Sequence, residues 1–323
     1  MSPYGLTFPL AGPLHAQRGL VEELASLGYT DVWSMEAGGF DAFTPLALAS
    51  VWAPQLRLGT AIVPAFTRGA ATIAQSAAAL ADAAPGRFVL GIGTSSNVIV
   101  ENWNGIAFDK PYERVRDVVR FLREALAGAK ISRAYDTFTV EGFRLTHVPE
   151  IPPKLLVAAL RPGMLRLAGR EADGAILNWL AAEDVATVAP YVHSGGPGKE
   201  IVARIFVVPV EDPAVARTVA KTAIAGYLTV PVYRAFHEWL GRGDALGPMW
   251  THWAAGDRKA AVASIPDEVA DALVVHGSPE ACRAHIQRYV DNGVTTPVVA
   301  LLSPPGTRLD ELAAMARALA PAR

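Results

Sequence analysis

A glycine-rich loop follows the fourth apolar run of the chain and carries hydroxyl side chains. Gly91-Ile-Gly93 is followed by Thr94, Ser95, Ser96 and Asn97. Uncovered backbone amides together with hydroxyl groups suit a phosphate or the polar edge of a cofactor. A dinucleotide fingerprint would place a third glycine where Ser96 stands and would begin a helix directly afterwards, and the sequence predicts neither. We therefore interpret Gly93–Asn97 as a candidate cofactor-binding loop, with a simple turn at the end of a strand as the alternative.

A second candidate joins the fifth apolar run to the helix that follows it, over Ala158-Ala159-Leu160-Arg161-Pro162-Gly163. Pro162 suits the first turn of a helix, where backbone amides have no intrahelical partner. Such amides favour an anion, and Arg161 lies beside them. The alternative is that Arg161 is a solvated surface residue.

Glu36 directly follows the second apolar run. A carboxylate at this position can act as an acid or base, or can orient the edge of a cofactor. The alternative is an ordinary loop charge.

The remaining reactive residues do not form a pattern that supports other chemistry. The seven histidines lack metal-ligand spacing, and His237-Glu238 is not followed by the rest of a zinc helix motif. Cys282 is the only cysteine, and its helical surroundings favour a packing thiol over a nucleophile. No Gly-x-Ser-x-Gly elbow is present. The near balance of 29 basic and 31 acidic residues gives no electrostatic reason to expect nucleic acid or an anionic membrane as a partner. We expect no metal, and a small molecule as the partner.

These residues sit on a regular alternation of short apolar runs and longer amphipathic runs. This pattern predicts parallel strands joined by crossover helices, in a (β/α)8 TIM barrel whose 323 residues form one domain. The expected strands are Tyr4–Phe8, Asp31–Met35, Leu56–Val63, Arg87–Ile92, Lys154–Ala159, Gly174–Asn178, Val202–Val208 and Pro297–Leu302. Because active sites of such barrels lie at the carboxyl ends of the strands, the candidate loops are expected to share one face.

Two segments interrupt the alternation. Over about 131–147, period-two alternation around Glu141-Gly142 predicts an inserted β-hairpin. Over about 213–257, a segment rich in aromatic residues predicts a helical insertion over the mouth of the barrel. Its aromatic side chains are interpreted as packing residues, with a lid over an apolar substrate as the alternative.

The amino terminus shows no basic region followed by an apolar signal core, and no apolar run approaches the roughly 20 residues that a membrane span needs. We therefore expect a cytoplasmic protein.

Several motifs, in this order and spacing, resemble those of the luciferase-like flavin- and F420-dependent oxidoreductases. The resemblance covers nearly the whole chain and is closest to the F420-dependent branch from actinobacteria. The matching segments are Arg57-Leu-Gly-Thr-Ala-Ile-Val-Pro with Arg68 beyond it, Gly86-Arg-Phe-Val-Leu-Gly-Ile-Gly, Val100-Glu-Asn-Trp-Asn-Gly, Phe108-Asp-Lys-Pro-Tyr-Glu-Arg-Val-Arg and Leu167-Ala-Gly-Arg-Glu-Ala-Asp-Gly.

The resemblance implies coenzyme F420 as cofactor, with its ring in the barrel mouth against the third strand. Phe8 and Glu36 would lie near the ring, and the loops Gly93–Asn97 and Ala158–Gly163 near the tail and phosphate. The family often carries a bulge with a non-proline cis peptide in the third strand, which falls on Ala61–Ile62 here. The alternative is a regular strand in which Ile62 points into the core of the barrel.

The resemblance also bears on the reaction. Sugar-phosphate dehydrogenases of this branch place a histidine after the acid of the second strand and a glutamate in the loop after the fourth strand. Ala37 and Ser96 occupy those positions here. Reduction of an activated C=C or C=N bond therefore fits better than oxidation of an alcohol, since the cofactor itself carries the hydride. The alternatives are an FMN-dependent monooxygenase on the same barrel and a barrel that binds the cofactor without catalysis.

A homodimer is also expected. Barrels of this family commonly pair through helices near the second and third strands, and the predicted helix over residues 70–84 has a face of small residues that would allow close approach. These residues are Ala70, Ala74, Ala77, Ala78 and Ala81.

Overall fold

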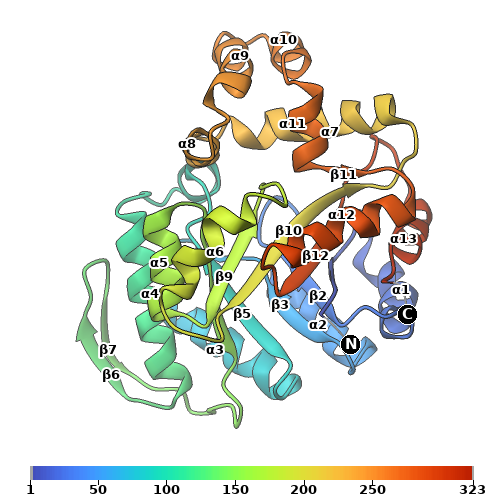
Figure 1. Ribbon diagram of the computed structural model, residues 1–323. Coiled ribbons are helices and arrows are strands. Elements are labelled where there is room, and N and C mark those ends of the chain that lie inside the picture. The colour runs from blue at the N-terminus through green and yellow to red at the C-terminus, as the bar shows by residue number, and fades with distance from the viewer. Residues whose placement is uncertain (1–2, 322–323) are drawn as a thin grey trace.

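A closed barrel of parallel strands forms the centre of the molecule (Figure 1), as predicted. The computed structural model describes residues 3–321. The barrel strands are β1 (Gly5–Thr7), β2 (Asp31–Ser34), β3 (Arg57–Thr60), β5 (Phe88–Gly93), β8 (Lys154–Ala158), β9 (Gly174–Asn178), β10 (Glu200–Val208) and β12 (Thr296–Leu301). They pair in that order, and β12 pairs with β1 to close the sheet.

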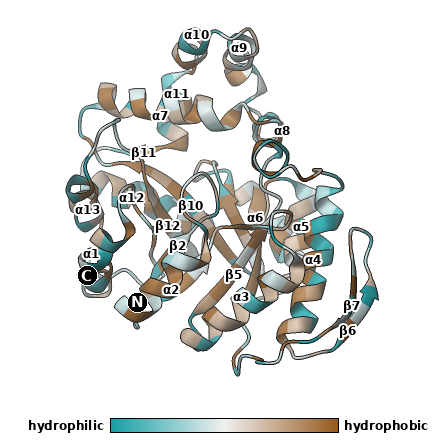
Figure 2. Cartoon of the chain, turned by 180° about the vertical axis from the view of Figure 1, so that it is seen from behind, coloured by the Kyte–Doolittle hydropathy of each residue, from teal (hydrophilic) through white to brown (hydrophobic). Residues whose placement is uncertain are grey.

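Helices cover the outside of the barrel because each has one apolar face. In α4, for example, Val115, Val118, Val119 and Leu122 share a face at helical spacing and are fully buried. Figure 2 shows the same division, with hydrophobic residues along the strands and polar residues toward solvent. The outer elements are η1 (Leu14–Gln17), α1 (Arg18–Leu27), α2 (Phe43–Trp52), α3 (Ala70–Ala83), α4 (Pro111–Leu126), α5 (Pro162–Glu171), α6 (Val185–His193), α12 (Pro279–Asp291) and α13 (Leu309–Ala318).

The third strand is interrupted where the resemblance predicted a bulge. β3 ends at Thr60, and the short strand β4 (Val63–Pro64) resumes the pairing with β5. The peptide between Ala61 and Ile62 is cis, so the cis prediction is confirmed and the regular strand is wrong. A second cis peptide, Phe8–Pro9, was not predicted.

The side chain of Thr60 replaces the backbone pairing that is lost at this interruption. Its hydroxyl accepts a hydrogen bond from the amide of Gly91 at 2.8 Å and donates one to the carbonyl of Gly91 at 3.0 Å. Gly91 must be a glycine, since a Cβ there would lie 2.0 Å from the carbonyl oxygen of Thr60. β3 and β5 are thereby held together at the point where their ladder stops.

The inserted hairpin is present, and its turn does not fall at Glu141-Gly142. β6 (Ile131–Ala134) and β7 (Thr139–Phe143) are antiparallel, and the chain turns between them over residues 135–138. Gly142 lies inside β7 with φ 67°, next to a shift in the strand register. The glycine therefore serves an irregularity of the strand and not the turn.

The helical insertion is also present and extends beyond the predicted end at residue 257. It comprises α7 (Pro213–Leu228), α8 (Pro231–Trp239), α9 (Gly243–Ala254), α10 (Arg258–Ala263) and α11 (Asp267–Leu273), and β11 (Val275–His276) then returns to β10. The insertion follows the carboxyl end of β10 and lies beyond that end of the barrel (Figure 1). Two of its aromatic residues, Phe236 and Trp250, are buried, as the packing interpretation predicted.

The small-residue face of α3 is not available to a second subunit. Its five alanines are at most 6% exposed, because they pack against the core of their own chain. The surface argument for a homodimer was therefore wrong.

None of the helices within residues 3–321 is long and apolar enough to cross a membrane.

We predict that G91A lowers the free energy of unfolding by about 2–4 kcal/mol, because the new methyl group overlaps the Thr60 carbonyl. Urea denaturation measures this difference. G226A is the matched control. Gly226 is exposed on α7 with no atom near its Cβ position, so alanine there should be neutral or stabilising by up to about 1 kcal/mol. Equal stability of both variants would contradict the role assigned to Gly91.

Candidate active site

The two predicted cofactor loops lie side by side at the carboxyl ends of neighbouring strands. β5 and β8 are paired, so the Gly93–Asn97 loop and the Ala158–Gly163 turn leave the barrel next to each other. Ser95 has a φ of 63°, an uncommon conformation for a residue with a side chain. The expectation that no helix begins after this loop was wrong, because η2 (Val98–Trp103), a six-residue π-helix, starts there.

The second loop has the predicted local structure. α5 begins at Pro162, and Arg161 precedes it in an extended conformation. The Arg161 side chain is exposed and forms no ion pair with any residue between 3 and 321. A cation and the free amides of a helix start are therefore available together at the rim of the mouth.

The wall of the mouth between these loops and β3 is made of small side chains. Ala61, Gly93 and Ala158 line it, with Ile62 beside them, and these side chains pack on the cluster that fills the barrel. A Cβ on Gly93 would lie 3.0 Å from both Ala158 and Ile62. This wall can therefore accept a flat group at close range.

Phe8 is placed elsewhere. It is 1% exposed and belongs to the core between the barrel and its helices. The structure thus does not bring it together with the other predicted cofactor-binding residues.

Glu36 lies at the rim, held by an arginine. Arg68 Nε lies 3.1 Å from both carboxylate oxygens of Glu36, and the amide of Ala42 donates to the same carboxylate at 3.2 Å. The backbone amide of Glu36 donates to the carbonyl of Ile62 at 3.1 Å, which ties it to the interrupted strand. The charge of Glu36 is compensated, so the carboxylate is a positioned group and not a free base.

A pocket of about 380 Å³ opens beside this ion pair. Besides Glu36 and Arg68 it is lined by Ala37, Gly39, Phe40, Asp41, Pro64, Thr67, Ile99, Trp103 and Asn104. Phe40 and Trp103 are large exposed apolar side chains, and the buried hydroxyl of Thr67 has no hydrogen-bond partner among the described residues. Apolar walls with a few polar groups are typical of ligand pockets.

The opposite side of the mouth holds polar residues that sequence reasoning missed. Asn178 ends β9, Arg204 lies on β10, and Tyr233 reaches them from α8 through a 2.7 Å hydrogen bond between Asn178 Nδ2 and the Tyr233 hydroxyl. A charged residue inside the otherwise apolar run 201–208 is the signal that identifies this group in the sequence.

α8 is anchored on the barrel by His237. Its Nε2 lies 3.0 Å from the carbonyl oxygen of Trp179, which itself is fully buried and stacks on Phe206. Burial, and to a smaller extent the positive charge of Arg242, lowers the pKa of His237 to about 3. His237 is therefore neutral at physiological pH, and Nε2 donates to the carbonyl.

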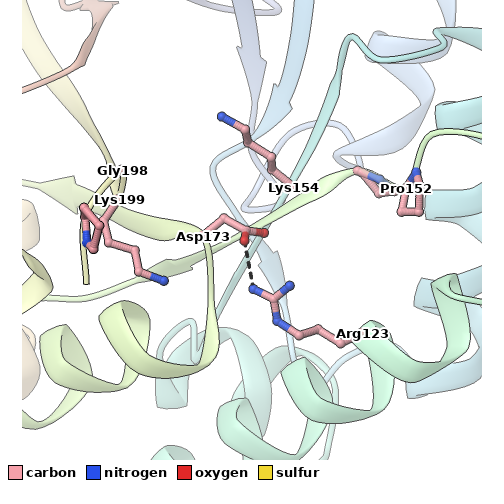
Figure 3. A pocket seen from close by; sticks show the side chains of 8 residues that line it. Arg123, Pro152, Lys154, Asp173, Gly198 and Lys199 are labelled. Atoms are coloured by element: carbon pink, nitrogen blue, oxygen red, sulfur yellow. Dashed lines mark hydrogen bonds and ion pairs between the residues drawn. The ribbon is translucent and has the colours of Figure 1, made fainter. Parts of the chain in front are cut away.

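A second pocket lies at the amino ends of the strands, away from the mouth (Figure 3). Arg123 pairs with Asp173 at 3.0 Å, Lys154 with Glu200 at 3.5 Å, and Lys199 donates to the carbonyl of Ala172. Arg123, Lys154 and Lys199 each have a partner already, and active sites of this fold lie at the carboxyl ends of the strands. We therefore assign these contacts to the stability of the fold.

The described residues do not assemble other reactive groups. Within residues 3–321, no three His, Cys, Asp or Glu side chains are placed to hold a metal ion. Cys282 is buried, and burial raises the pKa of its thiol to about 11, so it is protonated at neutral pH and unreactive, as expected.

Comparison with known families decides the classification. Residues 4–296 match the family model described as luciferase-like monooxygenase. The chain belongs to this family. The predicted family is thereby confirmed, and with it the enzyme class, an oxidoreductase.

The relatives include a reductase and a putative F420-dependent oxidoreductase. The chain is 25% identical to a 5,10-methylenetetrahydromethanopterin reductase of Methanolobus tindarius, over 90% of this chain and 92% of the relative. It is 27% identical to a putative coenzyme F420-dependent oxidoreductase of Mycobacterium tuberculosis, an actinobacterium, over 88% and 90% of the two chains.

A solved structure supports the fold. The coenzyme F420-dependent tetrahydromethanopterin reductase of Methanopyrus kandleri superposes with a TM-score of 0.79, over 99% of this chain and 98% of that chain, at 18% identity. The predicted TIM barrel is confirmed.

We predict that His237 makes the folded chain less stable in acid. The unfolded state binds a proton at this residue below about pH 6.5, whereas the folded state does so only near pH 3. Stability is therefore lost as the pH falls through this window. In H237Q, which keeps a donor for the Trp179 carbonyl, the loss of unfolding free energy between pH 7 and pH 5 should be about 1–2 kcal/mol smaller than in the wild type.

Urea denaturation at the two pH values measures this loss. H15Q, at an exposed histidine, is the control and should behave as the wild type. An equal loss in H237Q and the wild type would contradict the assignment.

Proposed function

We propose that the protein is a coenzyme F420-dependent oxidoreductase that reduces an activated C=C or C=N bond of a small organic substrate. The observation that carries the proposal is the small-residue wall of Ala61, Gly93 and Ala158 between two loops that suit a phosphate. The similarity to the putative coenzyme F420-dependent oxidoreductase of Mycobacterium tuberculosis and to the coenzyme F420-dependent reductase of Methanopyrus kandleri supports the choice of cofactor.

The residues present fit this cofactor. Gly93 and the two alanines would hold the flat ring, since larger side chains would fill the space that it needs. Arg161, the amides at the start of α5 and the hydroxyls of Thr94, Ser95 and Ser96 would hold the tail and its phosphate. When bound, reduced F420 supplies a hydride for the acceptor.

The chain's own residues bind and orient in this proposal, and supply little acid–base chemistry. Glu36 is compensated by Arg68, and Ala37 and Ser96 occupy the positions where the sugar-phosphate dehydrogenases of the branch carry histidine and glutamate. Among the described residues of this rim, no carboxylate without an ionic partner is positioned to take a proton from an alcohol. Reduction of an already polarised double bond needs positioning for the hydride and one proton, which solvent water at the open mouth supplies.

Two other classes compete with this proposal. The description of the family favours an FMN-dependent monooxygenase as second candidate. A barrel that binds the cofactor without turnover is the third. It would bind F420 yet reduce no acceptor in a broad panel.

We predict that the purified protein binds F420 at least about tenfold more tightly than FMN, which corresponds to about 1.4 kcal/mol of binding free energy. Isothermal titration calorimetry with each cofactor measures both affinities under the same conditions. Tighter binding of FMN would refute the F420 assignment and favour the monooxygenase.

The homodimer and the cytoplasmic location expected from the sequence stay predictions. Because the alanine face of α3 is buried, the only remaining support for the dimer is that related barrels commonly pair. Multi-angle light scattering should give twice the chain mass of 34.2 kDa at micromolar concentration. A mass near 34.2 kDa across that range would refute the dimer.

A further inference from the structure

An arginine lies inside the carboxyl half of the barrel and has no ionic partner among the residues that the structure describes. Arg204 lies in the middle of β10, in register with Val298 of β12 and Asn178 of β9. Residues in register on parallel strands point to the same face, and Val298 belongs to the cluster that fills the barrel interior. Arg204 therefore points inward. It is partly exposed, and its Nε has no hydrogen-bond partner among residues 3–321.

Arg57, another arginine of the barrel interior, has a structural role and is paired within the chain. At the amino end, Arg57 forms ion pairs with Asp31 and Glu200 and donates to the Thr296 hydroxyl at 3.1 Å. A cation removed from water is costly unless it is paired. Arg57 meets this requirement within the chain. Arg204 does not, so its charge is available to a ligand.

The neighbours of Arg204 can bind oxygen atoms and do not neutralise it. Its guanidinium lies 4.8 Å from the centre of the Phe206 ring. Tyr233 accepts a hydrogen bond from Asn178 and so keeps its own proton for another acceptor. Desolvation raises the pKa of Tyr233 to about 12, and the charge of Arg204 opposes this rise, so the hydroxyl remains a donor at neutral pH. Two donors thus face the mouth together.

Arg204 lies across the barrel from Ala61, the part of the proposed ring wall that follows β3, and is three strands from Gly93 on β5 and two from Ala158 on β8. In the closed order of strands, β10 is four strands from β3 in either direction. A molecule that lies between the wall of Ala61, Gly93 and Ala158 and the interior would meet Arg204 on its other side. That is the position of a substrate that exchanges a hydride with the ring.

We propose that Arg204, together with Tyr233, binds an anionic oxygen group of the substrate, either a carboxylate or a phosphate. This inference rests on the proposed function and narrows its substrate class to unsaturated compounds that carry such a group. A negative group is favoured because a guanidinium forms strong, paired hydrogen bonds with these oxyanions.

The test compares trans-cinnamate with cinnamamide, which have the same shape and differ in charge. trans-Cinnamate and cinnamamide are titrated into the F420-loaded protein and into the cofactor-free protein by calorimetry, and phenyl phosphate is titrated as the phosphate ligand. The wild type should bind at least one of the two anions about tenfold more tightly than cinnamamide. The stronger anion identifies carboxylate or phosphate. R204L and R204Q should abolish the preference, and R204K should keep part of it.

R144L is the matched control, because it removes the same charge from an exposed residue that directly follows β7, away from the mouth. It should bind all three ligands as the wild type does. Thermal melts confirm that the Arg204 variants are folded.

Equal binding of charged and neutral ligands by the wild type would overturn the inference, as would a preference that survives in R204L and R204Q. Loss of F420 affinity in these variants with unchanged anion affinity would also overturn it, because the anion would then belong to the cofactor. Failure of the wild type to bind F420 refutes the proposed function instead, and the cofactor-free titrations still decide the role of Arg204.

Discussion

The hydrogen bonds between the Thr60 side chain and Gly91 are the constraint on which the mouth of this barrel depends. A parallel barrel satisfies its backbone groups through continuous ladders, and an interruption leaves buried amides and carbonyls without partners. Thr60 satisfies both groups of Gly91 with one hydroxyl, and the missing Cβ of Gly91 lets the two strands stay close. The chain can then leave the ladder at Ala61–Ile62 and rejoin it at Val63 without loss of closure.

The interruption creates a mouth with two unlike walls. On one side, small side chains and two polar loops give space and anion-binding amides. On the other, Arg204 and Tyr233 bring donors that form no ion pair with an acid within residues 3–321. The Glu36–Arg68 pair closes the rim between β2 and β4 and has little net charge. In the proposed function, one wall recognises the cofactor and the other recognises the substrate.

The helical insertion is part of this arrangement. α8 holds Tyr233 against the end of β9, and the neutral His237 anchors the same helix on the Trp179 carbonyl. The packing interpretation therefore holds for part of the aromatic residues of the segment, and the lid over an apolar substrate stays a prediction. Phe236 and Trp250 are buried packing residues, whereas Tyr233 reaches the mouth.

The sequence predicts the barrel, its strand order and both insertions, because strand and helix periods follow from local patterns. It predicts the start of α5 from Pro162, and the family resemblance places the cis peptide. The pattern around Gly142 predicts the hairpin but does not locate its turn, because glycine marks both turns and strand irregularities, and only the pairing tells them apart. The alanine face of α3 was predicted to contact a second subunit, but it packs on the core of its own chain. Periodicity identifies such a face and does not show what covers it. The mouth donors were missed because Asn178, Arg204 and Tyr233 meet only through tertiary structure.

A crystal structure of the protein with oxidised F420 bound tests the account most directly. The account predicts electron density for the ring against Ala61, Gly93 and Ala158, the phosphate near Arg161, and a free space between the ring and Arg204. Density for the ring on the Arg204 wall, or in the pocket at the amino ends of the strands, would contradict it.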